Sequence, residues 1–261
     1  MTEVDPNTIH RVNHEIKRRR LEVLRVQDLT PRMRRITVGG PELAGFVSLG
    51  TDDHVKLFFP QNAEERAALD TIDPSAGKAQ GPMPEMRDYT PRRYDLDTLE
   101  LDIDFVLHGD GPAATWATQA TPGQYLNIGG PRGSMIVPDI FDSYLLIGDE
   151  TALPAIARRL EGLAPNRRAL VVVEVENGAE RQILQSPAHV QVIWVLREGR
   201  RDNLLTTVQQ LEMPSGKLYA WVATESKVSR QIRKVLLEEK GVDQEFLKAV
   251  GYWKAEGSEE E

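Results

Sequence analysis

The chain has 261 residues, no cysteine and a formal net charge of −8 at pH 7. This length is enough for two small domains whose cores need no crosslinks. The absence of cysteine excludes disulfides, all-cysteine zinc sites, cysteine-ligated iron–sulfur clusters and a cysteine nucleophile, and the acidic balance argues against a sequence-independent nucleic-acid binder.

Two features bear on membranes and location. The N-terminal segment lacks the apolar core of a signal peptide, and the longest uncharged stretch, Gly111 to Pro131, contains three prolines. A membrane-spanning helix must be predominantly apolar along its length, and three prolines would interrupt it. We therefore expect a cytoplasmic protein without membrane insertion.

The first half of the chain predicts short strands separated by turns. Strands are expected at 21–26, 35–38, 53–60 and 99–107. In the last of these, apolar residues at odd positions alternate with acidic residues, which is typical of a half-buried antiparallel strand. Such closely spaced short strands favour a small closed barrel. The polar stretch between Gln61 and Met86 is interpreted as a long surface loop with one helical turn at Glu64 to Leu69.

The second half has a different pattern. Continuous apolar runs at 144–147, 170–175, 190–195 and 218–223 alternate with helical segments that follow Gly148 and cover 203–212 and 226–240. This alternation predicts a parallel sheet with helices on its faces. The fold class is therefore β-barrel plus α/β: an antiparallel barrel domain over residues 1–139, followed by a parallel-sheet α/β domain over residues 140–261.

Arg87-Asp88-Tyr89-Thr90-Pro91-Arg92 is the first motif with chemical content. An arginine fork can donate two parallel hydrogen bonds to phosphate oxygens. A tyrosine can stack on a flat heteroaromatic ring, and a threonine hydroxyl can form a hydrogen bond with a ring nitrogen. The alternative is an ordinary arginine-rich edge strand.

Two glycine-rich segments follow. His108 ends a strand and precedes a glycine turn, after which Pro112 suits the first position of a short alanine-rich helix. Unsatisfied amides at such a helix start can bind an anion. The second segment, Gly129 to Ser134, follows another predicted strand. It equally suits a plain barrel corner.

In the α/β half, Gly148 to Pro154 lies between a strand and a helix, where parallel sheets bind ligands. The segment lacks the GxGxxG fingerprint, and Asp149 or Thr151 can equally be a helix cap. Ala223 to Ser226 occupies the same kind of position after the fourth strand. No histidine pair has reliable metal-ligand spacing, and no nucleophile motif is present, so we expect no metal site and no protein nucleophile.

Taken together and in this order, these motifs resemble the siderophore-interacting protein family, the flavin-dependent ferric-siderophore reductases of the ferredoxin–NADP reductase superfamily. The resemblance extends from about Leu21 to Trp253 and includes Asp104–Gly109, Gly111–Ala117, Gly130–Ser134, Gly148–Ala155 and Gly251–Lys254. It implies an FAD on the barrel, a nicotinamide cofactor on the α/β domain, and reduction of a ferric siderophore by electron transfer through the flavin.

The resemblance also implies which residues bind cofactors. For FAD they are Arg87, Tyr89, Thr90, Arg92, Asp104, His108, Gly111, Pro112, Ala113, Thr115, Trp116, Gly133 and Ser134. For the nicotinamide cofactor they are Asp149, Thr151, Ala152, Thr224, Glu225 and Ser226. Because the flavin carries the electrons, no protein side chain is expected to act as an acid, base or nucleophile.

The electron donor stays open between NADPH, NADH and a ferredoxin. Glu174 and Glu176 suit a ribose diol, whereas Arg197, Arg200 and Arg201 suit a 2′-phosphate and tip the balance slightly to NADPH. Two other functions stay open as well: a siderophore-binding or delivery protein with little redox activity, and a generic flavin reductase without a role in iron metabolism.

An acidic protein repels an anionic ferric catecholate at long range, so binding requires a local basic pocket. Lys56, Arg132 and Lys254 are the predicted contributors. Each can equally be an ordinary surface cation.

Overall fold

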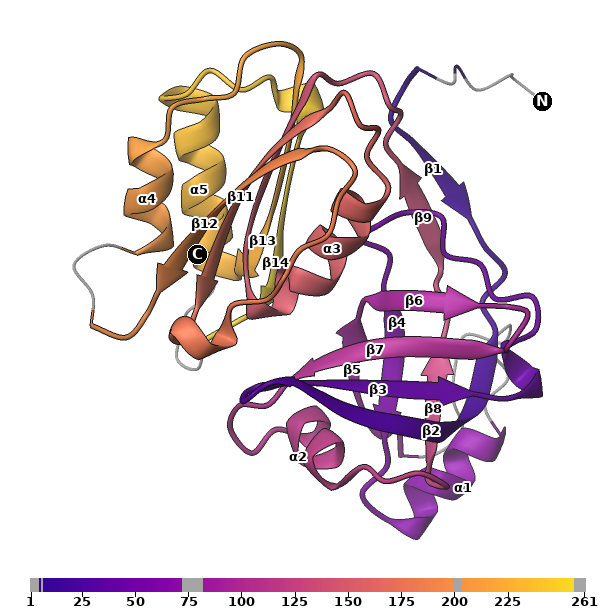
Figure 1. Ribbon diagram of the computed structural model, residues 1–261. Coiled ribbons are helices and arrows are strands. Elements are labelled where there is room, and N and C mark those ends of the chain that lie inside the picture. Colours follow the sequence, from indigo (N-terminus) through magenta and orange to yellow (C-terminus); the bar gives the residue numbers. More distant parts are fainter. Residues whose placement is uncertain (1–4, 6, 72–81, 200–202, 256–261) are drawn as a thin grey trace. The chain divides into compact units, whose positions relative to one another are not determined.

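The structure is a computed structural model that describes residues 5, 7–71, 82–199 and 203–255. The chain divides into two compact units, one containing Thr8–Val137 and the other Pro138–Glu261 (Figure 1). No helix in the described part of the chain is long and apolar enough to cross a membrane.

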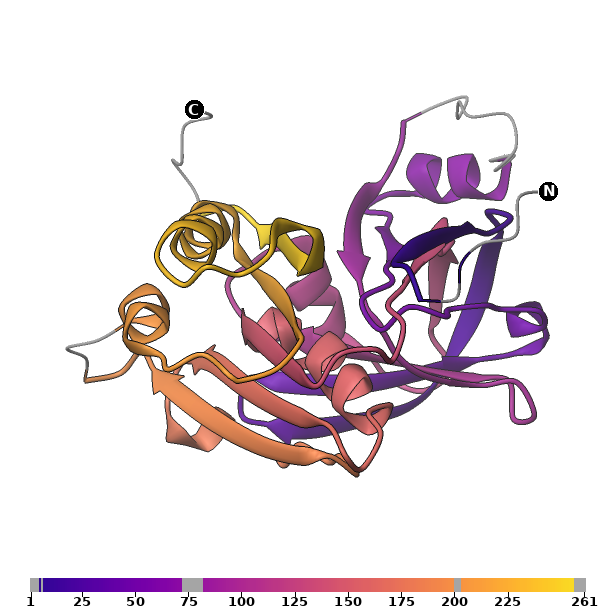
Figure 2. The same cartoon turned by 90° about the horizontal axis from the view of Figure 1, so that it is seen from above.

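The first unit is built on a seven-stranded antiparallel sheet in the order β5-β4-β8-β2-β3-β7-β6. Its strands are β2 (Arg18–Thr30), β3 (Met33–Gly39), β4 (Val55–Phe59), β5 (Glu85–Tyr89), β6 (Pro91–Asp95), β7 (Glu100–Val106) and β8 (Tyr125–Gly129). The predicted antiparallel barrel is thus confirmed, but it is a curled half-barrel with β5 and β6 at its two edges rather than the closed barrel that the short strands favoured (Figures 1 and 2). Pro91, the first residue of β6, has no amide hydrogen to donate to a further strand.

Smaller elements complete this unit. Strands β1 (His10–Asn13) and β9 (Gly133–Ile136) form a separate antiparallel pair. The helices are η1 (Pro41–Leu43), α1 (Ala63–Thr71) and α2 (Pro112–Gln119). Helix α1 confirms the helical turn predicted at Glu64 to Leu69, while residues 72–81 of the predicted loop lie outside the described residues.

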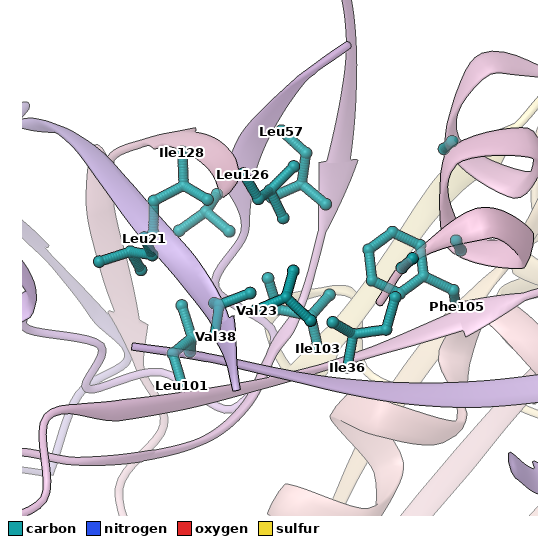
Figure 3. Packing of buried hydrophobic residues seen from close by; sticks show 14 of the residues in the cluster. Leu21, Val23, Ile36, Val38, Leu57, Leu101, Ile103, Phe105, Leu126 and Ile128 are labelled. Atoms are coloured by element: carbon teal, nitrogen blue, oxygen red, sulfur yellow. The ribbon is translucent and has the colours of Figure 1, made fainter. Parts of the chain in front are cut away.

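The core of the half-barrel follows the alternation of its strands. Apolar side chains from β2, β3, β4, β7 and β8 point to one side of the sheet, and the ten labelled in Figure 3 are at most 1% exposed. The prediction of a half-buried β7 is wrong in one respect, because Asp102 and Asp104 on its other face are also buried. Arginines on neighbouring strands cover that face, with Arg93 on Asp102 and Arg35 on Asp104.

The second unit has a five-stranded parallel sheet in the order β12-β11-β10-β13-β14. Its strands are β10 (Ser143–Asp149), β11 (Arg168–Val175), β12 (His189–Leu196), β13 (Leu218–Glu225) and β14 (Leu247–Trp253). Four of them correspond to the predicted apolar runs, and β14 was not predicted. The helices are η2 (Glu150–Ala152), α3 (Leu153–Glu161), η3 (Gly178–Glu180), α4 (Leu204–Gln210), α5 (Ser226–Glu238) and η4 (Gln244–Phe246).

The central strand β10 is buried along its whole length because helices cover both faces of the sheet. Leu145 and Ile147 share a cluster with α4 and α5. Gly148 faces α3, and a Cβ there would lie 2.3 Å from the Cβ of Ala152 and 2.7 Å from the carbonyl of Ala223. Only glycine therefore fits at this position, and it lets the chain turn closely from β10 into η2.

Candidate functional site

In the first unit, the predicted flavin motif lies on the edge strand β5. Residues Arg87 and Tyr89 pair with Leu57 and Val55 of β4, so they share the face that carries the core. Arg87 is exposed, and its guanidinium donates to Glu85 at 2.6 Å and to the carbonyl of Met86 at 2.8 Å. Burial raises the pKa of Tyr89, so its phenol stays neutral.

Tyr89 belongs to an aromatic cluster that connects β5 to helix α2. Its ring centroid lies 4.6 Å from that of Phe105, which lies 5.6 Å from that of Trp116. The ring centroid of Trp116 also lies 6.0 Å from that of Phe59 in β4. The structure thus brings together Tyr89 and Trp116, which the sequence predicted separately. Phe105 and Phe59 were predicted only as strand residues, because nothing in an alternating apolar pattern separates a core aromatic from a site aromatic.

Helix α2 begins without a side-chain cap. Gly111 precedes it and Pro112 is its first residue, while the amide of Thr115 is already bonded to the carbonyl of Gly111 at 2.9 Å. The amides of Ala113 and Ala114 are therefore the donors that an anion can use. The preceding His108 and the glycine turn are exposed. A guanidinium, an aromatic cluster and an uncapped helix start fit a ligand that combines flat rings with phosphates, as FAD does.

Asp104 and Arg92, two of the predicted FAD residues, have partners within the first unit. Asp104 accepts two hydrogen bonds from Arg35, at 2.7 and 2.8 Å, and lies 4.0 Å from Arg92. Asp104 therefore holds β3 and β6 on β7 and keeps Arg92 at the edge of the sheet. Thr90, between β5 and β6, is 7% exposed.

A buried hydrogen-bond network joins Ser134, in β9, to the loop before β4. Ser134 donates to Asp53 at 2.5 Å and accepts from the amide of Leu49 at 3.0 Å. Because its only hydroxyl hydrogen is used, Nε2 of His14, at 2.7 Å, must be a donor to it. Ser134 thus serves the loop rather than an open surface. Asp53 was predicted only as a strand residue, and His14 was predicted only not to belong to a metal-binding pair.

The predicted siderophore residues are all at the surface. Arg132 is exposed in the loop before β9, and Lys56 on β4 forms an ion pair of 2.8 Å with Asp88 on β5. Each member of this pair is about half exposed. Lys254 follows β14 in the second unit and is also exposed.

In the second unit, Asp149 is the centre of the predicted nucleotide edge. It ends β10 and is 1% exposed. Its Oδ1 accepts from the amide and hydroxyl of Thr151, and its Oδ2 accepts from Thr224 and from the indole of Trp253, both at 2.8 Å. Strands β10, β13 and β14 are thereby joined at their carboxyl ends. The order of the sheet reverses between β10 and β13, which is where such sheets bind dinucleotides.

Arg197 has a different role from the one predicted. Its guanidinium is bonded to both oxygens of Glu150, at 2.6 and 2.7 Å, and to Glu174 at 3.0 Å, with Glu176 at 3.7 Å. Burial acts to lower the pKa of Arg197, but these carboxylates outweigh it and the pKa lies above its usual range. This side chain is committed to carboxylates rather than available to a 2′-phosphate. Arg200 and Arg201 lie outside the described residues.

The remaining predicted nucleotide residues lie around the start of α5 and in η2. Glu225 caps α5 by accepting from the amides of Lys227 and Val228. Ser226 donates to the carbonyl of Trp253 at 2.9 Å, and Ala152 is fully buried behind Gly148. The structure thus gathers Asp149, Thr224, Glu225 and Ser226 at one edge of the sheet.

Comparison with known proteins agrees with this arrangement. The model of the siderophore-interacting FAD-binding domain matches residues 22–135, and that of the siderophore-interacting protein matches residues 141–256. The chain is 34% identical to the NADPH-dependent ferric-chelate reductase of Escherichia coli, over 96% of this chain and 98% of that protein. It is 30% identical to the ferric vibriobactin reductase ViuB of Vibrio cholerae, over 95% of each chain.

Solved structures give the same result. A siderophore utilization protein from T. fusca matches with a TM-score of 0.81 and 36% identity, covering 96% of this chain and 97% of that one. Phthalate dioxygenase reductase matches with a TM-score of 0.61 and 10% identity, over 90% of this chain and 68% of that one, and so shows the fold alone. The two family models together cover nearly all of the described chain, so this protein belongs to the siderophore-interacting protein family and its first unit is an FAD-binding domain.

Proposed function

We propose that this protein is a cytoplasmic, FAD-dependent reductase that takes electrons from NAD(P)H and reduces the iron of ferric siderophores. The observation that carries the proposal is the similarity over at least 95% of both chains to two relatives named as ferric-chelate and ferric vibriobactin reductases. The first of these is named as NADPH-dependent. The geometry of both units supports the same activity.

The first unit supplies the groups that would hold the flavin. Arg87 and the amides of Ala113 and Ala114 would bind its pyrophosphate, and the aromatic cluster of Tyr89 would lie against its rings. When bound, FAD would accept two electrons as a hydride and pass them on one at a time. The loop that carries Arg132 is held by the amide of His14, which donates to the carbonyl of Arg132 at 3.0 Å.

The second unit would hold the nicotinamide donor at the reversal of strand order between β10 and β13. Lys56, Arg132 and Lys254 would attract the anionic siderophore, a catecholate in our proposal. Reduction weakens the iron complex, because an anionic ligand attracts iron(II) less strongly than iron(III). The iron then leaves without a protein acid or nucleophile.

Anaerobic spectroscopy tests the proposal in two steps. NADPH or NADH should bleach the flavin absorbance of the purified protein, and a ferric catecholate should then restore it while an iron(II) chelator changes colour. Bleaching by reduced ferredoxin alone would replace NAD(P)H as the donor. If no donor bleaches the flavin, the protein is a siderophore carrier; if the ferric catecholate fails to reoxidise it, the protein is a generic flavin reductase. Cell fractionation tests the cytoplasmic location.

A further inference from the structure

The polar groups at the carboxyl edge of β10 and β13 satisfy one another almost completely. Both oxygens of Asp149 accept two hydrogen bonds each. The hydroxyl hydrogens of Thr224 and Ser226 are donated to Asp149 and to the carbonyl of Trp253. The carboxylate of Glu150 accepts hydrogen bonds from Arg197 and from the amide of Glu176. Among these described residues, little capacity is left for a ligand.

Glu225 is the exception. The residue is 8% exposed, and its Oε2 accepts from the amides of Lys227 at 2.8 Å and Val228 at 3.0 Å. Its Oε1 is buried and has no hydrogen-bond partner in the described part of the chain. A buried acceptor without a donor is costly, so such an atom commonly marks a place where something else binds. A carboxylate oxygen accepts only, so its partner must carry an N–H or O–H group.

The position of Glu225 in the sheet indicates which part of a dinucleotide supplies that donor. Glu225 ends β13, on one side of β10, whereas Glu176, whose side chain is 39% exposed, follows β11 on the other side. A dinucleotide binds across such a reversal of strand order, and acidic residues after the second strand suit the adenosine ribose. The nicotinamide end then falls on the β13 side, and its carboxamide carries the only N–H groups of the ring.

We propose that Oε1 of Glu225 accepts a hydrogen bond from the carboxamide of the nicotinamide ring and so selects this ring over close analogues. The inference rests on the proposed function, in which NAD(P)H is the donor. An analogue with 3-acetylpyridine offers a carbonyl but no N–H, and one with nicotinic acid offers a second carboxylate that Glu225 repels. Both leave Oε1 without a partner and should bind weakly.

Equilibrium binding tests the proposal without relying on turnover. The ligands are the oxidised coenzyme, NADP⁺ or NAD⁺ as the bleaching experiment selects, and its 3-acetylpyridine analogue, titrated calorimetrically into the FAD-loaded protein. The wild type should bind the natural coenzyme roughly 10- to 100-fold more tightly, as expected for a hydrogen bond to a charged acceptor. In Glu225→Gln the single amide oxygen still caps α5, and the NH₂ group faces the ligand, so the ratio should fall to about one.

The matched control is Glu239→Gln, which removes an exposed carboxylate at the other end of α5 and should keep the wild-type ratio. The proposal is overturned if the wild type does not discriminate, a result that needs no folded variant. It is also overturned if Glu225→Gln keeps the wild-type ratio, or weakens both ligands equally, which would indicate a ribose hydroxyl as the partner. If neither the coenzyme nor its analogue binds, NAD(P)H is also wrong as the proposed electron donor. If NAD(P)H bleaches the flavin but the coenzyme and its analogue bind equally well, only this inference is wrong.

Discussion

Arg87 and Tyr89 are two residues apart on one face of β5, yet they differ in their surroundings. The guanidinium of Arg87 is exposed and, among the described residues, is bonded to Glu85 and Met86 of its own strand, while Tyr89 is partly buried against Phe105. The arginine can therefore move to a phosphate at little cost. The tyrosine is positioned before any ligand arrives.

Replacing Arg87 should consequently weaken the binding of FAD without unfolding the protein. We expect Arg87→Ala to raise the dissociation constant of FAD roughly 10- to 100-fold, the value of a hydrogen bond to a charged group. Fluorescence titration of the apoprotein measures this. The matched control is Arg25→Ala, because Arg25 is also exposed and also paired with a glutamate, Glu100. Equal affinity of Arg87→Ala and wild type would remove Arg87 from the flavin site.

Arg197 is a structural residue in our interpretation, and its replacement should affect stability rather than coenzyme preference. Removing it leaves Glu150, only 7% exposed, without its cation. We expect Arg197→Met to lower the free energy of unfolding by about 2–4 kcal/mol and to leave the ratio of NADPH to NADH activity unchanged. Adding Glu150→Gln should restore part of the loss. A selective loss of NADPH activity would instead assign Arg197 to the 2′-phosphate.

At the scale of elements, the β1–β9 pair is held to the half-barrel by the buried Asp53–Ser134–His14 network. Ser134→Ala leaves Asp53 and the amide of Leu49 each short of one partner, which should cost about 1–3 kcal/mol. Hydrogen exchange should report faster exchange at Leu49 and His14. Ser143→Ala, at an equally buried serine of the other unit, is the control and should leave these amides protected. Unchanged exchange in Ser134→Ala would show that backbone pairing alone holds β1 and β9.

The elements also show what the sequence could predict. Strands β10, β11 and β13 are continuous apolar runs, so their burial on both faces was predictable, whereas β12 has the same kind of run but lies at the edge of the sheet and is only partly buried. Strand β14 has no such run, because Lys248 and Gly251 interrupt its apolar residues. Its pairing depends on contacts distant in sequence, such as that of Trp253 with Asp149. The same limit applies to the candidate sites. The motifs predicted which segments contain the site residues. They could not predict that Asp104, Ser134 and Arg197 bond to other side chains of the protein, because those partners are distant in sequence.

At the scale of the whole molecule, the formal net charge of −8 opposes an anionic ferric siderophore. A ferric tris-catecholate carries about three negative charges, so its binding depends on local cations and weakens as salt screens them. Charge reversal at Lys56, Arg132 or Lys254 should raise the half-saturating concentration of this chelate and leave flavin reduction by NAD(P)H unchanged. Equal losses with a cationic iron chelate would show that these residues do not attract the anionic chelate by their charge.

The ion pair of Lys56 with Asp88 supplies an opposite prediction within the same molecule. Asp88→Asn releases the lysine from its partner at 2.8 Å and should lower the half-saturating concentration of the anionic chelate several-fold. Steady-state iron reduction at low and high salt measures the effect, with Asp28→Asn as the control, because Asp28 pairs with Arg34 elsewhere on the surface. Weaker binding in Asp88→Asn would mean that Asp88 orients Lys56 rather than neutralising it.

Gly148 has a consequence for anyone who mutates this protein at random and screens for iron reduction. Any larger residue at 148 must displace Ala152 and the carbonyl of Ala223, so activity disappears although Gly148 has no group that reacts. Substitutions of its neighbour Asp149 would give the same result, because two of its hydrogen bonds join β10 to β13 and β14 and two more hold Thr151 in η2. In a map of tolerated substitutions, the turn after β10 would therefore look like a catalytic centre. Only a parallel assay of folded protein, such as protease resistance, separates a backbone that cannot accommodate a side chain from a side chain that does chemistry.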